Sequence, residues 1–166
     1  YGEYPQKVPS KVLQDILEMI YNNYQSYIIE TGKVYTVDSR SVDDNEKDFK
    51  EQVIKEYLFS DGKKYVRVKA NTFHFTCIND LSNGETYKRG DYVWVEVQPI
   101  KWLIDEKSDI ALSERILFAG VQFKNGIMFE KNYNGDFRTT DIKLFMDKYF
   151  SKDIIPSKSM INQKDN

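Results

Sequence analysis

The sequence has only one cysteine and one histidine among its 166 residues. With Cys77 alone, no disulfide can form within the chain, and neither a four-cysteine zinc site nor one of two cysteines and two histidines can be built. A Ser-His-Asp triad would have to use His74, and no G-x-S-x-G turn is present. Phosphate-binding patterns of the G-x-x-x-x-G-K-[ST] and G-x-G-x-x-G kinds are also missing. We therefore assign no catalytic residue and no metal ligand, and we expect no cofactor.

Long apolar runs and an excess of charge of one sign are missing too. No run approaches the roughly 18 apolar residues that a membrane helix needs, so we expect no membrane span. The 24 lysines and arginines are balanced by 26 acidic residues, and the two kinds are interleaved, as in "DEKSD" and "NEKD". A nucleic-acid-binding protein usually carries a basic face or stripe, so we expect no nucleic-acid partner.

The compartment is left open by the sequence. The chain begins at Tyr1 rather than at methionine, so we expect residues upstream of it. A signal peptide or a lipid anchor could be among them. Both the cytoplasm and the cell surface or secreted space stay possible.

Two helices are predicted from apolar spacing. Ser10 can cap a helix over residues 11–24, whose apolar stripe we expect to face the core: Val12, Leu13, Ile16, Leu17, Ile20 and Tyr24. Thr139 or Thr140 can cap a second helix over residues 140–150, with the stripe Ile142, Phe145, Met146 and Tyr149.

Strands are predicted between and after these helices. A turn at Gly32 should lead into a strand over Val34–Val37, and "TFHFTC" is a candidate short strand. The clearest hairpin surrounds Asp61-Gly62, a pair favoured in type I′ turns.

The stretch "YVWVEVQPIKWLID" has the strongest alternation in the chain. We expect one central strand over residues 92–104, with valines on one face and Tyr92, Trp94 and Glu96 on the other. Pro99 should mark a bulge or an edge. Trp102 should be a core residue packed by the return strand "IALSERIL", and Trp94 should be partly exposed.

Together these patterns predict an α+β fold. We expect a single domain over residues 1–150, built on a mainly antiparallel, twisted sheet packed by the N-terminal and the C-terminal helix. Residues 151–166 are polar and contain a helix-breaking proline, so they are predicted to be a tail or linker.

Three stretches, in this order, resemble a bacterial family. They are "YGEYPQ", "PIKWLID…ALSERILFAGVQF" and "GDFRTTDIKLFMDKYF", and the likeness extends from Tyr1 to about Asp153. The chain resembles the N-terminal part of the DUF6273 family, a domain of unknown function, without the lectin-like segment that follows in longer members. The resemblance implies a bacterial origin and no particular activity.

Candidate sites are few. Tyr92, Trp94 and Glu96 are the candidate binding residues, because aromatic rings beside a carboxylate could hold a ligand and shift the pKa of Glu96. Cys77 and His74 lie three apart, which places them on opposite faces of a strand. "DDNEKD" at 43–48 lacks the central glycine and distal glutamate of a calcium loop. "RGD" at 89–91 serves equally well as a turn.

Three functions remain as hypotheses. The first is a non-enzymatic binding or interaction module of a bacterial or phage protein, with a protein or carbohydrate ligand. The second is an enzyme, or the remnant of one, that uses carboxylates near Glu96. The third is a structural N-terminal domain that presents a downstream module.

Overall fold

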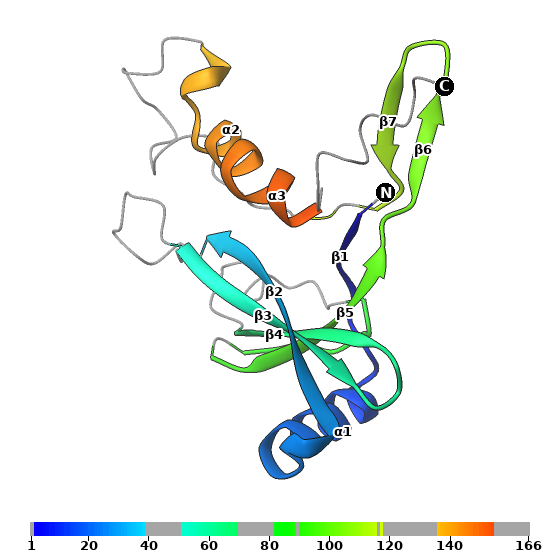
Figure 1. Cartoon of the computed structure of the whole chain (residues 1–166), viewed down its shortest axis with the longest axis vertical. Helices are drawn as coiled ribbons and strands as arrows, with labels where there is room; N and C mark the ends of the chain where they lie inside the picture. Colours follow the sequence, from blue (N-terminus) through cyan, green and yellow to red (C-terminus); the bar gives the residue numbers. More distant parts are fainter. Residues whose placement is uncertain are drawn as a thin grey trace.

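The computed structural model describes residues 2–38, 51–69, 82–88, 90–115, 117 and 136–154. Figure 1 shows the arrangement of these elements. In chain order they are β1 (Glu3–Lys7), α1 (Lys11–Asn23), the 3₁₀ turn η1 (Gln25–Tyr27), β2 (Ile28–Asp38), β3 (Glu51–Phe59), β4 (Lys64–Lys69), β5 (Tyr92–Pro99), β6 (Trp102–Asp105), β7 (Ile110–Ser113), η3 (Phe137–Thr139), α2 (Asp141–Phe145), the π-helical turn η4 (Met146–Phe150) and α3 (Ser151–Ile154).

A five-stranded antiparallel sheet forms the centre of the described chain. Its strand order is β1-β5-β4-β3-β2, and β6 and β7 form a separate two-stranded sheet. The predicted mainly antiparallel sheet is confirmed. The helices that accompany it are few and short.

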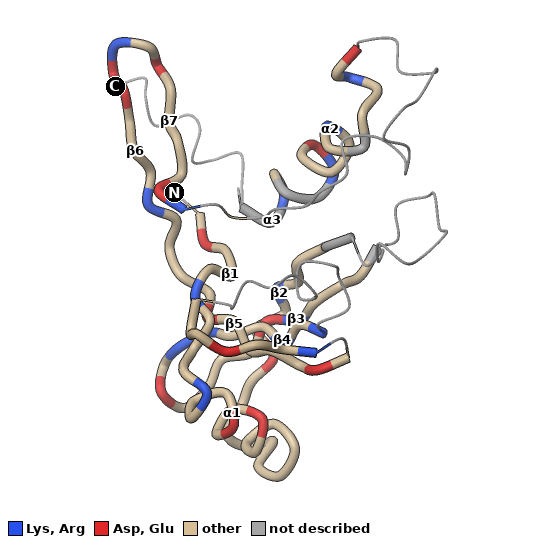
Figure 2. Tube along the Cα trace, turned by 180° about the vertical axis from the view of Figure 1, so that it is seen from behind, with Lys and Arg blue, Asp and Glu red and all other residues tan. Residues whose placement is uncertain are grey.

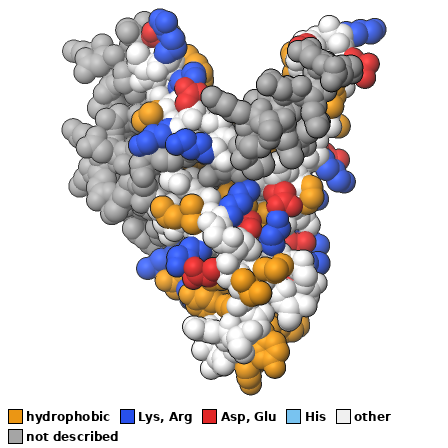
Figure 3. Space-filling model, viewed as in Figure 1, with side chains coloured by type: hydrophobic (Ala, Val, Ile, Leu, Met, Phe, Trp, Pro, Cys, Tyr) orange, Lys and Arg blue, Asp and Glu red, His pale blue; other side chains and the backbone are white. Residues whose placement is uncertain are grey.

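Helix α1 covers one face of this sheet. The Ser10 hydroxyl accepts a hydrogen bond from the Leu13 backbone N–H, so the predicted cap is present. Leu17 is buried with three aromatic residues of the sheet, Phe59, Tyr65 and Trp94. The predicted stripe is only half right, because Val12, Ile16 and Tyr24 are exposed. Figure 3 shows apolar side chains gathered at the end of the molecule that carries α1.

The opposite face of the sheet carries a second core. It is made of aliphatic and tyrosine side chains from all five strands and the residue after β5: Tyr4, Tyr35, Ile54, Val66, Val97 and Ile100. The C-terminal helical segment contacts β2 and β1, and Phe145 within it is buried. Thr140 caps α2 through the backbone N–H of Lys143, as predicted.

The β3–β4 hairpin is confirmed, but its turn is not type I′. Only Gly62 has a positive φ, of 79°, whereas type I′ requires positive φ at both central residues. The Gly62 N–H donates to the Phe59 carbonyl, and the Phe59 N–H donates to the Lys63 carbonyl. This is a longer loop in which glycine alone takes the left-handed conformation.

The predicted turn at Gly32 is wrong. Strand β2 runs through it without a break, and the register against β3 shifts between Glu30 and Val34. Gly32, with φ of 84°, therefore lies at a bulge, which an achiral residue accommodates easily.

The single strand predicted over residues 92–104 is also wrong. It divides at Ile100 and Lys101 into β5 and β6, which belong to different sheets. The register shift next to β5 lies in β1, between Pro5 and Lys7, and not at Pro99.

The burial of the two tryptophans is the reverse of the prediction. Trp94 is 1% exposed, because α1 covers its face of the sheet. Trp102 is half-buried, packed against the second core at the base of the β6–β7 hairpin. The residues expected to bury Trp102 do not do so, since Ile110 and Leu112 are exposed and Ile116 lies outside the described residues.

Several predictions fall outside the described residues. They concern the strand "TFHFTC" with His74 and Cys77, the acidic stretch 43–48, Arg89 of the "RGD" tripeptide and the tail after Ile154. The helix itself continues to Ile154, beyond the end of the domain proposed from the sequence.

Candidate functional site

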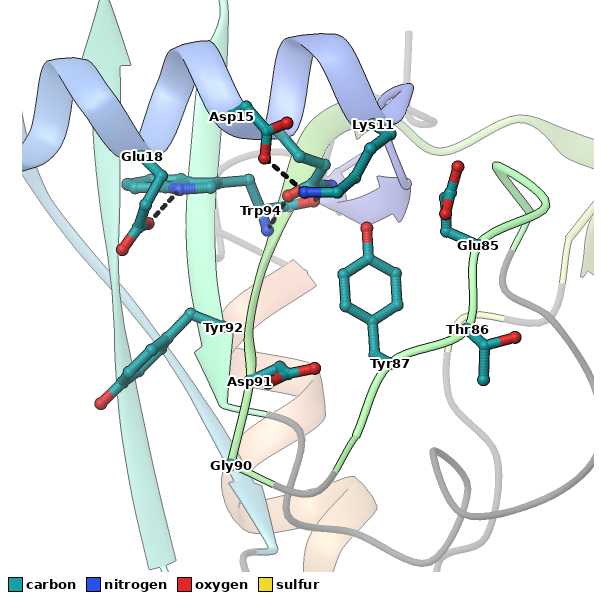
Figure 4. Close-up of a pocket in the computed structure, with 11 residues that line it drawn as sticks. Lys11, Asp15, Glu18, Glu85, Thr86, Tyr87, Gly90, Asp91, Tyr92 and Trp94 are labelled. Carbon is teal, nitrogen blue, oxygen red and sulfur yellow. Dashed lines mark hydrogen bonds and ion pairs between the residues drawn. The ribbon is translucent and has the colours of Figure 1, made fainter.

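A cavity of about 480 Å³ lies between α1, the segment 85–91 and the start of β5. Figure 4 shows its walls. Helix α1 contributes side chains from its first two turns, and β5 contributes its first aromatic residues. The lining residues are Lys11, Gln14, Asp15, Glu18, Glu85, Thr86, Tyr87, Gly90, Asp91, Tyr92 and Trp94.

Gln14 fixes the position of α1 over β5. Its side-chain N–H₂ donates to the Trp94 carbonyl and its side-chain oxygen accepts from the Trp94 N–H, both at 2.7 Å. Strand β1 pairs with β5 only as far as Glu96. The Gln14 amide therefore continues the ladder beyond the end of β1 and satisfies a buried backbone pair.

Glu18 links α1 to two strands of the sheet. It accepts hydrogen bonds from the Arg67 guanidinium, at 3.0 Å and 2.5 Å, and from the Trp94 indole N–H, at 2.8 Å. Burial raises the pKa of Glu18, but these hydrogen bonds and the charge of Arg67 outweigh it and hold the pKa below its usual value. Glu18 is therefore ionised at neutral pH.

Of the described residues that line the cavity, Lys11 alone is cationic. Its ammonium pairs with Asp15, and Figure 4 shows it directed into the same part of the cavity as the Tyr87 hydroxyl. The hydrogen bond to Asp15 is the main cause that raises the pKa of Lys11, and the charge of Glu85 raises it further. The electric field at this position therefore favours a positive charge.

Two more carboxylates come from the segment opposite α1. Asp91 accepts a hydrogen bond of 2.8 Å from the Lys88 backbone N–H, and Glu85 donates its own backbone N–H to the Asn83 side chain. These bonds hold the loop that faces the helix. In the described part of the lining, four carboxylates, from Asp15, Glu18, Glu85 and Asp91, thus stand against one ammonium.

The structure brings two of the three candidate binding residues to this cavity. Tyr92 and Trp94 line it, although the Arg67 guanidinium lies 3.4 Å from the Tyr92 ring centre and covers one face of the ring. Glu96 does not line it. Glu96 is 8% exposed, accepts from the Gln98 amide at 3.2 Å and lies 3.8 Å from the Lys63 ammonium. The face of β5 that carries Glu96 is therefore not open to solvent at this position.

Sequence reasoning missed the helix side of the site. The apolar spacing of this helix identifies its core-facing residues but gives no signal for the polar residues Gln14, Asp15 and Glu18. Gln14 held the one usable signal, since a glutamine between Leu13 and Leu17 lies next to the buried residues of a helix. The contribution of residues 85–91 depends on a contact over some 75 positions of sequence, which no local pattern reveals.

Two further properties bear on the chemistry. Among the residues that the structure describes, no three His, Cys, Asp or Glu side chains gather as metal ligands would. In the same part of the chain, no helix is long and apolar enough to cross a membrane. Figure 2 shows that charges of both signs alternate along the described trace.

The chain matches no protein-family model, no curated protein and no solved structure. The resemblance to the DUF6273 family therefore stays a prediction.

Proposed function

We propose that the chain is a non-enzymatic binding module whose cavity holds a cationic group, the ammonium or guanidinium of a partner protein's side chain. One observation carries the proposal: among the residues that the structure describes, four carboxylates and a single lysine line a cavity of about 480 Å³. Such a lining attracts a positive group and repels a negative one. The ammonium of Lys11 pairs with Asp15 of this lining.

A protein ligand is favoured over a carbohydrate because the rings of the site are not free for stacking. Sugars commonly pack on an open aromatic face. Trp94 is enclosed by the edges and faces of Tyr21, Tyr57 and Phe59, with ring centres 5.2 to 6.0 Å away. Tyr92 has one face covered by Arg67.

An enzyme centred on Glu96 is the weaker hypothesis. General acid–base chemistry needs a carboxylate within reach of a bound substrate. Glu96 is buried outside the cavity, with Gln98 and Lys63 as its neighbours. A purely structural role for the domain would leave the acidic cavity without a purpose, so we place it third.

The test is a titration of the ¹⁵N-labelled full chain with N-acetyl-lysine methylamide and N-acetyl-arginine methylamide, followed by NMR. N-acetyl-glutamate methylamide and methyl glucoside serve as the anionic and sugar probes. We expect shifts at Gln14, Tyr87 and Trp94 with the cationic probes, and weaker binding as salt increases.

A pair of variants links the binding to the carboxylates. Glu85→Gln with Asp91→Asn should weaken binding of the cationic probes by about three- to tenfold, since each exposed charge contributes a few tenths of a kcal/mol. Glu30→Gln removes an exposed carboxylate of β2 outside the cavity and should change nothing. If only the sugar shifted cavity resonances, or if Glu30→Gln weakened binding equally, the proposal would be wrong.

A further inference from the structure

Two ion pairs involve carboxylates of the cavity, and the first is held rigidly. Arg67 donates two hydrogen bonds to Glu18, at 3.0 Å and 2.5 Å. The guanidinium also lies 4.8 Å from the ring centre of Tyr21 and 3.4 Å from that of Tyr92, and the Arg67 side chain is 18% exposed. Two hydrogen bonds and two rings fix this pair in one geometry, so we expect it to stay in place.

The second pair, of Lys11 with Asp15, is held weakly. Both side chains are more than half exposed, at 54% and 64%. Lys11 is the first residue of α1, where the positive end of the helix dipole disfavours a cation. A lysine four residues before an acid is also the weaker order for a pair on a helix. Exposed pairs of this kind open and close with populations that differ only a few-fold. Lys11 therefore leaves Asp15 readily.

The place that the Lys11 ammonium takes is nevertheless suited to a cation. Figure 4 shows the ammonium next to Asp15 and directed into the part of the cavity where the Tyr87 hydroxyl lies. The hydrogen bond to Asp15 raises the pKa of Lys11 most, and the charges of Tyr87 and Glu85, on the segment that faces the helix, raise it as well. Groups from both walls thus favour a positive charge at one point.

We propose that Lys11 holds the place of a lysine ammonium of the partner protein, which displaces Lys11 from Asp15 when it binds. The inference rests on the proposed function and names the residue that the ligand exchanges. Lys11 then turns toward solvent, which its exposed position allows. Because the place is open only while Lys11 is away from it, the apparent affinity is the intrinsic affinity reduced to the unpaired fraction.

A lysine is favoured over an arginine as the incoming group. An ammonium is a compact charge with three donors, which single oxygens of separate groups can accept. Asp15, Tyr87 and Glu85 carry such oxygens and line the cavity. A guanidinium prefers both oxygens of one carboxylate, as Arg67 has from Glu18.

Removal of the competing ammonium tests the exchange. Lys11→Met keeps an unbranched side chain without the charge, so the full chain should bind N-acetyl-lysine methylamide about threefold more tightly in an NMR titration. Lys88→Met is the matched control. Lys88 is an exposed lysine of the facing segment, outside the described lining, and it contacts Asp91 through its backbone N–H only. It should change the affinity by less than about twofold, since salt screens a charge outside the cavity.

Two outcomes of this titration would overturn the exchange. Equal gains for Lys11→Met and Lys88→Met would show an effect of net charge alone. A gain confined to N-acetyl-arginine methylamide would show that the place does not select an ammonium. Binding of neither probe, to the parent or to Lys11→Met, would instead remove the proposed function and this inference with it.

The side chain of Lys11 reports its displacement directly. Asp15→Asn removes the acid, so the ε-CH₂ resonances of Lys11 in this variant give the positions of an unpaired lysine. When N-acetyl-lysine methylamide is added to the ¹³C-labelled parent, these resonances should move toward those positions. If the probe shifted Tyr87 resonances in the parent but left the Lys11 ε-CH₂ resonances unchanged, both cations would share the cavity and the proposed exchange would be wrong.

Discussion

At the scale of single residues, Trp94 connects the core to the cavity. Its ring is enclosed by aromatic neighbours, and its indole N–H is held by Glu18. Trp94→Ala should lower the free energy of unfolding by about 3–5 kcal/mol, as large-to-small core changes do. Trp102→Ala should cost less, because that ring is only half-buried. Urea unfolding followed by far-UV circular dichroism measures both values.

Fluorescence provides an independent check on these two residues. In single-tryptophan variants, acrylamide should quench Trp102 more strongly than Trp94. Trp94→Phe is the control, since it keeps a smaller aromatic ring in the core and loses the indole N–H that donates to Glu18. A larger loss of stability for Trp102→Ala, together with free quenching of Trp94, would contradict the described packing.

Glu18 should make stability depend on acid pH. Its pKa is lowered in the folded state, so its ionised form stabilises the fold above the usual glutamate value of 4.5, and this contribution is lost as the pH falls through the lower, folded value. Glu18→Gln should thus have a lower free energy of unfolding than the parent at pH 7. The difference between the two free energies should narrow below pH 4.5. Urea unfolding over this pH range tests the expectation.

The control for Glu18 is a similar change at the surface. Glu30→Gln breaks an ion pair with Lys55 in which both side chains are 57% exposed, so its effect should be small at every pH. If the difference in unfolding free energy between the parent and Glu18→Gln widened as the pH falls, the pKa of Glu18 would not be lowered in the folded state.

The sequence predicted which residues of β5 share a face, but not which face is buried. Alternation correctly placed Tyr92, Trp94 and Glu96 on one face of β5, because side chains alternate in any strand. It could not tell which face a helix covers. The polar residues beside Trp94 suggested solvent, but Gln14 and Glu18 of α1 meet its backbone and its ring. A polar residue is thus compatible with burial when a partner from a distant element satisfies it.

At the scale of elements, the joint between α1 and β5 depends on Gln14. Gln14→Leu replaces the amide by an apolar side chain of similar size, and leaves the Trp94 N–H and carbonyl without their partner. Each buried unsatisfied group costs about 1–3 kcal/mol, so we expect a loss of about 2–5 kcal/mol in unfolding free energy. Urea unfolding measures it.

Two exposed substitutions isolate the effect of Gln14. Ser26→Ala lies in η1, outside the joint, and Ile16→Leu changes an exposed apolar residue of α1, so both should stay close to the parent. If Gln14→Leu were as stable as these variants, a water molecule or a shift of the helix would have to satisfy Trp94.

Elements with strong local signals were predictable, and their ends were less so. Helix α1 has a cap at Ser10, and the β3–β4 hairpin has a glycine that takes positive φ. The division of residues 92–105 between two sheets has no comparable signal. Ile100 donates its N–H to the Gly2 carbonyl, and this contact with the start of the chain lies where β5 ends. A pairing so distant in sequence cannot be predicted from the alternation itself.

At the scale of the whole molecule, the sheet has α1 against one face and the C-terminal helical segment near both of its edge strands. The segment contacts β2 through η4, and β1 and β2 through α3. Its one buried hydrophobic side chain among those described is Phe145. Since β1 and β2 are the two ends of the strand order, a segment that contacts both should stabilise the sheet as a unit.

The boundary of the domain can be measured from this arrangement. A chain that ends after Ile154 should melt within about 5 °C of the full chain, a difference of the order of 1 kcal/mol for a domain of this size. A chain that ends after Phe150 should melt lower than either, because it also removes α3 and its contacts with β1 and β2. Thermal unfolding followed by circular dichroism compares the three chains.

If the two shortened chains melted together at the temperature of the full chain, α3 would contribute nothing and the domain would end at 150, as the sequence predicted. A large drop already on ending after Ile154 would instead show that residues 155–166 are held against the fold.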